Sequence, residues 1–125
     1  MSESDALLAP FDGDLLDVVA DENDVTPERL RELVVAHQRQ VRDNPGVEDI
    51  VYEWRSQFHE QPVLRRTEST YYLRLRPHVW DEFADALDLT EPELDALLYL
   101  HSEQTRRDTD GTPDDNALPM ILARD

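Results

Sequence analysis

The fold is decided by the stretch PVLRRTESTYYLRLRP, residues 62–77, where the hydrophobic period changes from about 3.6, typical of a helix, to 2, typical of strands. Residues 63–67 and 70–76 are predicted to form a β-hairpin that turns at Glu68 and Ser69. With a two-residue loop, the expected cross-strand pairs are Arg66 with Tyr71, Arg65 with Tyr72, and Leu64 with Leu73. The turn lacks the glycine that tight hairpins favour, so the register can shift by a residue.

Amphipathic helices are predicted on both sides of this hairpin. Apolar residues recur at spacings of three and four over about 27–43 and 46–60 before it, and over about 77–88 and 91–106 after it. Thr90 and Glu93 form a capping-box motif at the start of the last helix, and Asp14 to Ala20 are expected to add one or two helical turns. The sequence therefore predicts an α+β fold, mainly α, with four to five short helices packed around a small antiparallel β-hairpin and with acidic, flexible ends.

The chain is expected to form one domain flanked by two acidic segments. Residues 1–25 form an acidic N-terminal segment with eight acids and no arginine, whereas residues 26–107 form the helical domain with the central hairpin at about 62–76. Residues 108–125 are an acidic linker followed by a short apolar segment that contains Leu118, Met120, Ile121 and Leu122. That apolar segment either docks on the domain, as an extra strand beside the hairpin, or remains an exposed motif that binds another protein.

The composition excludes several classes of site. The chain has 125 residues and no cysteine, so disulfides, thiolate metal sites and cysteine nucleophiles are absent. The three glycines are too scattered for a phosphate-binding loop, and no two of the four histidines have ligand spacing on one helix. We therefore expect no cofactor, no metal and no catalytic residues. Short apolar runs, and a start without the positive region of a signal peptide, indicate no membrane contact and a cytoplasmic protein.

The charged residues are strongly biased toward acids, and the basic ones toward arginine. There are 29 acidic and 12 basic side chains, every basic one is arginine, and the formal net charge is −17. Such a surface resembles that of proteins from extremely halophilic archaea, because molar salt shrinks the screening length to about 3 Å and removes the repulsion between carboxylates. The stretches TPERLRELVVAHQRQVRDNPGVEDIVYEWR and VLRRTESTYYLRLRPHVWDEFADALDLTEPELDALLYLH resemble a small haloarchaeal family of unknown function. This resemblance implies a fold but supplies no catalytic residues.

The candidate binding residues are Arg65, Tyr72, Arg74 and Arg76, which share one face of the predicted hairpin. Guanidinium groups bind phosphates or carboxylates in pairs, and a tyrosine ring can stack on a base or on arginine. The alternative is that these arginines pair with carboxylates of the chain itself, with Arg65 over the ring of Tyr72. Charge runs usually form such solvated and locally compensated faces, so this second interpretation is favoured.

Three classes of function stay open. The favoured one is a non-catalytic interaction module that binds a protein partner or a second copy of itself. The first alternative is a winged-helix-like DNA-binding regulator, with residues 46–60 as recognition helix and the hairpin as wing. The acidic residues of that helix and the net negative charge disfavour nucleic acid without excluding it. An enzyme with an unrecognised site is the second alternative.

Overall fold

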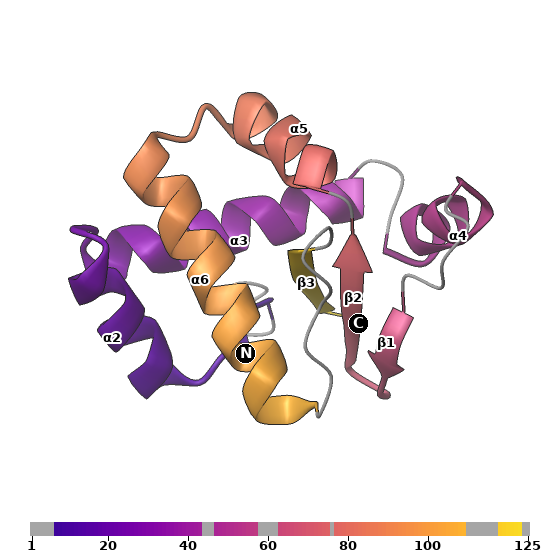
Figure 1. The fold of residues 1–125 in the computed structure, drawn as a ribbon, viewed down its shortest axis with the longest axis horizontal. Helices are drawn as coiled ribbons and strands as arrows, with labels where there is room; N and C mark the ends of the chain where they lie inside the picture. The colour runs from indigo at the N-terminus through magenta and orange to yellow at the C-terminus, as the bar shows by residue number, and fades with distance from the viewer. Residues whose placement is uncertain (1–6, 44–46, 58–62, 76, 110–117, 124–125) are drawn as a thin grey trace.

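A computed structural model describes residues 7–43, 47–57, 63–75, 77–109 and 118–123 of the chain. Figure 1 shows the elements in these ranges, which are α2 (Gly13–Glu22), α3 (Pro27–Asp43), α4 (Val47–Gln57), β1 (Val63–Arg66), β2 (Thr70–Leu75), α5 (Pro77–Leu87), α6 (Glu91–Asp108) and β3 (Leu118–Ala123). The predicted α+β class, mainly α, is confirmed. The predicted flexible ends lie largely outside the described residues, at 1–6, 110–117 and 124–125.

The sheet has three antiparallel strands in the order β1-β2-β3. The apolar segment near the C-terminus is thus a strand beside the hairpin, as one of the two sequence alternatives predicted. Its pairing with β2 runs from Thr70 opposite Ala123 to Leu75 opposite Leu118. Because β3 supplies a second neighbour, β2 is a central strand rather than the exposed half of a two-stranded hairpin.

The register of the hairpin is partly as predicted. Arg65 lies opposite Tyr72 and Arg66 opposite Tyr71, but the expected pairing of Leu64 with Leu73 is wrong. The register shifts between Val63 and Arg65, so that Val63 takes the place opposite Leu73. An extra residue in one strand of an antiparallel pair is the usual form of a β-bulge. The sequence did not predict this one, because a turn that lacks glycine does not fix the register of the strands.

The predicted helices are confirmed, with small differences at their ends. The buried stripe of α3 is the predicted one, formed by Leu30, Leu33, Val34, His37 and Val41. At the start of α6 the capping box is present, since the Glu93 amide donates to Thr90 Oγ1 (3.3 Å) and the Thr90 amide donates to Glu93 Oε1 (3.0 Å). This helix continues to Asp108, two residues beyond the predicted end, and α4 ends at Gln57, with residues 58–60 outside the described ranges.

Two aspartates end helices in the left-handed region of backbone space. Asp24 follows α2 with φ 57°, and Asp88 follows α5 with φ 54°. In each case the next amide bonds back into the helix, from Val25 to the Ala20 carbonyl and from Leu89 to the Ala84 carbonyl, both at 3.0 Å. This arrangement satisfies carbonyl groups at the helix end and turns the chain sharply toward the next helix.

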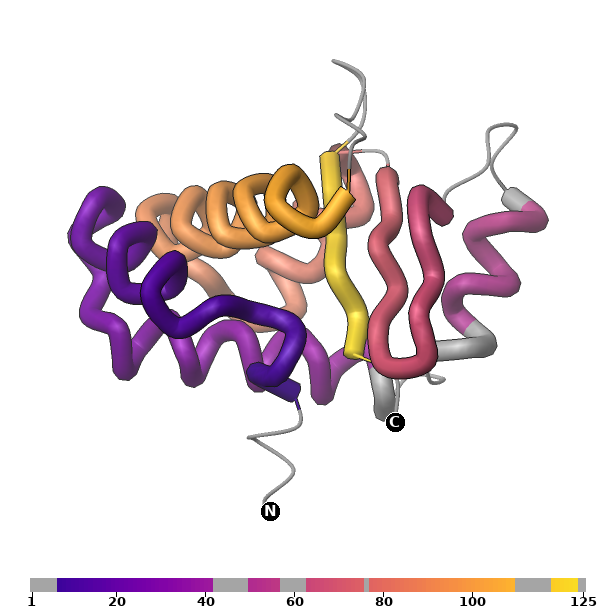
Figure 2. The backbone as a smooth tube through the Cα atoms, turned by 90° about the horizontal axis from the view of Figure 1, so that it is seen from below, coloured from indigo at the N-terminus to yellow at the C-terminus, as the bar shows by residue number. Residues whose placement is uncertain are grey.

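Most of the helices lie toward the β3 edge of the sheet. Figure 2 shows α2, α3 and α6 beside β3, whereas α4 lies beyond β1 at the other edge. The acidic helix α2 packs against both α3 and α6, through Leu15, Leu16, Val19 and Ala20. One core thus joins residues from near both ends of the described chain.

Candidate functional site

The predicted binding residues of the hairpin lie in different surroundings. Arg65 is exposed and is paired directly with Tyr72, which is buried. Arg74 lies opposite Pro119 and is half-buried, while Arg76 lies outside the described residues. Among the three predicted residues that the structure describes, Arg65 and Tyr72 lie directly opposite each other.

Both of these residues bind Asp108, at the end of α6. Arg65 Nη1 donates to the Asp108 carbonyl oxygen at 2.7 Å, and the Tyr72 hydroxyl donates to the Asp108 carboxylate at 2.8 Å. Burial, together with the bond to Asp108, raises the pKa of Tyr72 to about 12. The pair thus fastens the C-terminal end of α6 to the sheet, where a cation interacts favourably with the helix dipole.

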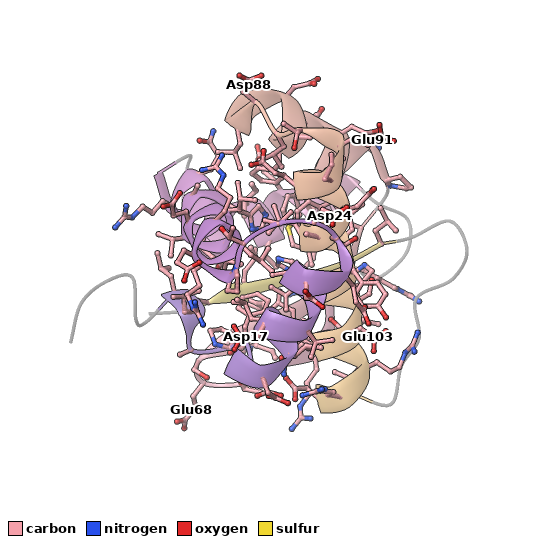
Figure 3. The ribbon with its side chains drawn as sticks, turned by 90° about the vertical axis from the view of Figure 1, so that its left-hand side faces the viewer. Asp17, Asp24, Glu68, Asp88, Glu91 and Glu103 are labelled. Carbon is pink, nitrogen blue, oxygen red and sulfur yellow. The ribbon has the colours of Figure 1, made fainter. Side chains whose placement is uncertain are left out.

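Other arginines pair with the chain's own carboxylates. Arg29 Nε binds Glu93 at 2.7 Å. The pKa of the Glu93 carboxyl is lowered, mainly by the hydrogen bond from the Thr90 amide and secondly by the bond from Arg29. Arg107 binds Asp12 at 3.0 Å. Figure 3 labels six further acidic residues from different parts of the chain, Asp17, Asp24, Glu68, Asp88, Glu91 and Glu103. Such exposed pairs contribute little to stability, but they compensate charge locally.

A largely buried cluster of rings lies where the helices meet β3. We call this the aromatic cluster, and it consists of Phe11, His37, Trp80, Phe83 and His101. His37 stacks on Trp80 with 4.8 Å between ring centroids, and His101 meets Trp80 edge-on at the same separation. The two histidine rings are 5.4 Å apart and both are fully buried. Helical spacing correctly placed both histidines on apolar stripes, but it could not show that the two stripes converge.

Gln38, next to this cluster on α3, closes part of the outer edge of β3. Its Nε2 donates to the Ile121 carbonyl at 2.7 Å, and its Oε1 accepts from the Ala123 amide at 2.8 Å. The side-chain amide therefore makes the two bonds that a neighbouring strand would make. Sequence analysis missed Gln38, since a polar residue beside an apolar stripe carries no signal of its partner.

Two members of the aromatic cluster complete this edge. The Ile121 amide donates to His101 Nδ1 at 2.9 Å, and Trp80 Nε1 donates to the Pro119 carbonyl at 3.1 Å. Pro119 has no amide hydrogen, so it leaves no donor unpaired at this position. Side chains thus cover the edge at residues 119, 121 and 123, which protects it from pairing with another strand.

The buried histidines have the chemistry of structural groups. Burial lowers the pKa of His37 to about 3, and burial followed by repulsion from His37 lowers the pKa of His101 well below its usual value. Because His101 Nδ1 accepts a hydrogen bond, its neutral ring carries the proton on Nε2, and this atom has no partner among the described residues. Both rings lack contact with solvent, so neither can transfer a proton to a bound substrate.

Within the described ranges, no group of three or more histidine, aspartate or glutamate side chains is placed to hold a metal ion. No helix in those ranges is both long enough and apolar enough to span a bilayer.

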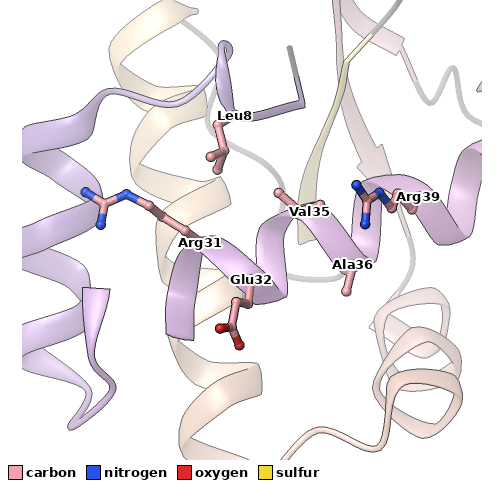
Figure 4. Close-up of a pocket in the computed structure, with 6 residues that line it drawn as sticks. All are labelled: Leu8, Arg31, Glu32, Val35, Ala36 and Arg39. Atoms are coloured by element: carbon pink, nitrogen blue, oxygen red, sulfur yellow. The ribbon is translucent and has the colours of Figure 1, made fainter. Parts of the chain in front are cut away.

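The exposed side of α3 carries a hollow of about 360 Å³. We call it the α3 hollow, and it is lined by Leu8, Arg31, Glu32, Val35, Ala36 and Arg39. Figure 4 shows Leu8 and Val35 facing the space between α3 and the segment before α2, with Arg31 and Arg39 toward its two ends. Leu8, Val35 and Ala36 are half-buried, so the hollow presents apolar surface to solvent. Sequence analysis missed it because Val35 and Ala36 fall outside the core stripe and Leu8 is remote in the chain.

Comparison with known proteins gives a family but no activity. The family described as "Domain of unknown function (DUF8048)" matches residues 9–124, which include every element from α2 to β3. Neither the curated proteins nor the solved structures contain a match to this chain. Since the match covers nearly the whole sequence, the chain belongs to the DUF8048 family.

Proposed function

We propose that the protein is a non-catalytic interaction module and that the α3 hollow is the surface that receives its protein partner. The observation that supports this proposal is the half-buried apolar lining of Leu8, Val35 and Ala36 on an exposed helix face. Apolar surface rimmed by charged residues is characteristic of protein-binding sites. A hollow this open suits one or two side chains of a partner better than an enclosed small molecule.

The other classes have less support. For an enzyme, the two residues with the most displaced pKa, His37 and His101, are sealed in the core. For a DNA-binding protein, Arg65 is bound to the end of α6, and Arg55 on α4 is accompanied by the exposed acid Glu53. No observation of the described residues favours either class over the interaction module.

The composition also bears on the salt content of the cell in which the protein works. We propose that the protein works in the cytoplasm of a cell with high internal salt, as the resemblance to haloarchaeal proteins implies. The supporting observations are the absence of lysine and the net charge of −17. In such a medium, association depends on short-range contacts, because charges more than a few ångströms apart are screened.

Site-specific photocrosslinking tests the proposed surface. A benzoylphenylalanine replaces Val35 in the hollow or, as control, Tyr99, which is exposed on α6. We expect the Val35 position to give one discrete adduct in molar KCl and the Tyr99 position to give none. The crosslinked polypeptide, once identified by mass spectrometry and purified, should bind the unmodified chain and not the Val35→Asp variant. Equal crosslinking from both positions, or binding that survives Val35→Asp, would contradict the proposal.

A further inference from the structure

The α3 hollow has a charge pattern that restricts what it can receive. Arg31, Val35 and Arg39 are spaced by four residues, so they lie along one face of α3 over a length of about 12 Å. Figure 4 shows the two arginines at opposite ends of the hollow, with Val35 between them. The pattern is therefore a cation, an aliphatic centre and a second cation.

The one acid of the lining does not cancel this pattern. Glu32 lies 3.1 Å from Arg29 Nη1, a cation outside the hollow that it shares with Glu93, and the lining itself holds two arginines against this one carboxylate. Arg31 binds Asp17 at 3.2 Å, in a pair whose side chains are both about half exposed. Exposed pairs of this kind are weak, and a guanidinium has five N–H donors, so Arg31 can accept a further carboxylate. Arg39 also interacts within the chain, and the same donor count applies to it.

From this geometry we infer that the partner segment is an acidic amphipathic helix. An aliphatic residue of that helix packs against Leu8, Val35 and Ala36, and carboxylates one turn before and one turn after it reach Arg31 and Arg39. Helices bind apolar grooves through residues spaced in this way, and carboxylates match the guanidinium fork. The inference rests on the proposed function, since it names the chemistry of the partner at the same surface.

The net charge of the protein alone would favour the opposite kind of partner. A body with charge −17 attracts cationic peptides without any specific site, so nonspecific binding would favour a basic helix. Only recognition by the α3 hollow would favour an acidic one.

The probe is a synthetic alanine-rich helical peptide in which one leucine has glutamates four residues before and four residues after it. Its controls carry lysine in place of both glutamates, or serine in place of the leucine. Titrations followed by amide chemical shifts are made at the lowest KCl concentration that keeps the native circular dichroism spectrum. We expect the glutamate peptide to bind most tightly and to shift the amides of Val35 and Ala36.

Variants of the full chain separate this site from general charge effects. Arg39→Glu should weaken the glutamate peptide about 5- to 10-fold, as expected from losing one exposed ion pair and gaining a like-charge contact. Val35→Asp should abolish the shifts, and Arg106→Glu, on the exposed side of α6, should leave affinity unchanged. Tighter binding of the lysine peptide, or equal effects of Arg39→Glu and Arg106→Glu, would overturn the inference. So would a homodimer that covers Val35, because the occupant would then be a second copy. If Val35 crosslinks to a partner that lacks such a helix, this inference fails while the proposed function stands.

Discussion

The buried histidines predict a loss of stability in mild acid. His37 and His101 are neutral in the folded chain, and burial holds the pKa of His37 at about 3. In the unfolded chain both rings are hydrated and titrate near their ordinary pKa of about 6.5. The unfolded state therefore takes up protons first as the pH falls. Stability is fully present above about pH 6.5 and declines below it, down to about pH 3 for His37.

The size of the effect follows from proton linkage. Each histidine that is protonated only in the unfolded state lowers the free energy of unfolding by about 1.4 kcal/mol per pH unit. Between pH 6.5 and 4.5 His37 alone accounts for about 2–3 kcal/mol, a large part of the stability of a small domain, and His101 adds to the loss in the same direction. The carboxylates also titrate over part of this range, so the contribution of histidine has to be isolated with a variant.

The variant is His37→Phe, which keeps a ring against Trp80 and removes one titrating group. Among the described residues the His37 ring makes one hydrogen-bond contact, a long one of 3.4 Å from Nδ1 to Gln38 Nε2, so little is lost with it. Urea unfolding in 2 M KCl, followed by far-ultraviolet circular dichroism from pH 7.5 to 4.5, gives the free energy of unfolding. We expect the slope of the variant to be smaller by about 1.4 kcal/mol per pH unit.

A second variant controls for disturbed packing. Trp80→Phe alters the same cluster and loses the bond to the Pro119 carbonyl, but it removes no titrating group. Its stability should be lower at every pH, with the slope of the unmodified chain. Parallel pH profiles for the unmodified chain and His37→Phe would refute the reasoning, because they would mean that His37 is not buried as a neutral group.

Three further predictions concern the edge of β3, the start of α6 and salt. Gln38→Met leaves the Ile121 carbonyl and the Ala123 amide unpaired, so it should cost about 2–5 kcal/mol in urea unfolding and speed hydrogen exchange at Ala123. Equal effects from the half-buried Gln40→Met would count against this role of Gln38. Thr90→Ala removes the cap of α6 and should lower the free energy of unfolding by about 1 kcal/mol. An unchanged urea midpoint would show that the capping box does not stabilise the chain. Raising KCl from 0.1 to 2 M should raise the Tm, by about 4 °C for each kcal/mol of repulsion relieved, and a flat profile in calorimetry would argue against carboxylate crowding.

Periodicity and capping were enough to predict the helices. The bounds of α3 and the capping box of α6 follow from residues within one or two turns of each other, so local sequence carries the information. The third strand could also be anticipated, because the apolar run at 118–122 needed cover and a two-stranded hairpin is weak alone. These features depend on short-range physics that a single sequence displays.

The rest depends on which distant residues meet. Gln38 closes the edge of a strand more than 80 positions away in the chain, and no feature of the sequence around Gln38 indicates that partner. The interpretation of the hairpin arginines depends on Asp108, which the sequence does not distinguish from the many other acidic residues. The α3 hollow likewise needs Leu8 beside Val35. In each case the missing information is tertiary packing, which hydrophobic patterns constrain only weakly.

The position of β3 in the chain has a consequence for synthesis. Every other described element precedes this strand, yet the side chains of Gln38, Trp80 and His101 find their backbone partners only on it. A nascent chain from which β3 has not yet emerged therefore lacks the backbone partners of these three side chains, so the helices alone cannot close the core.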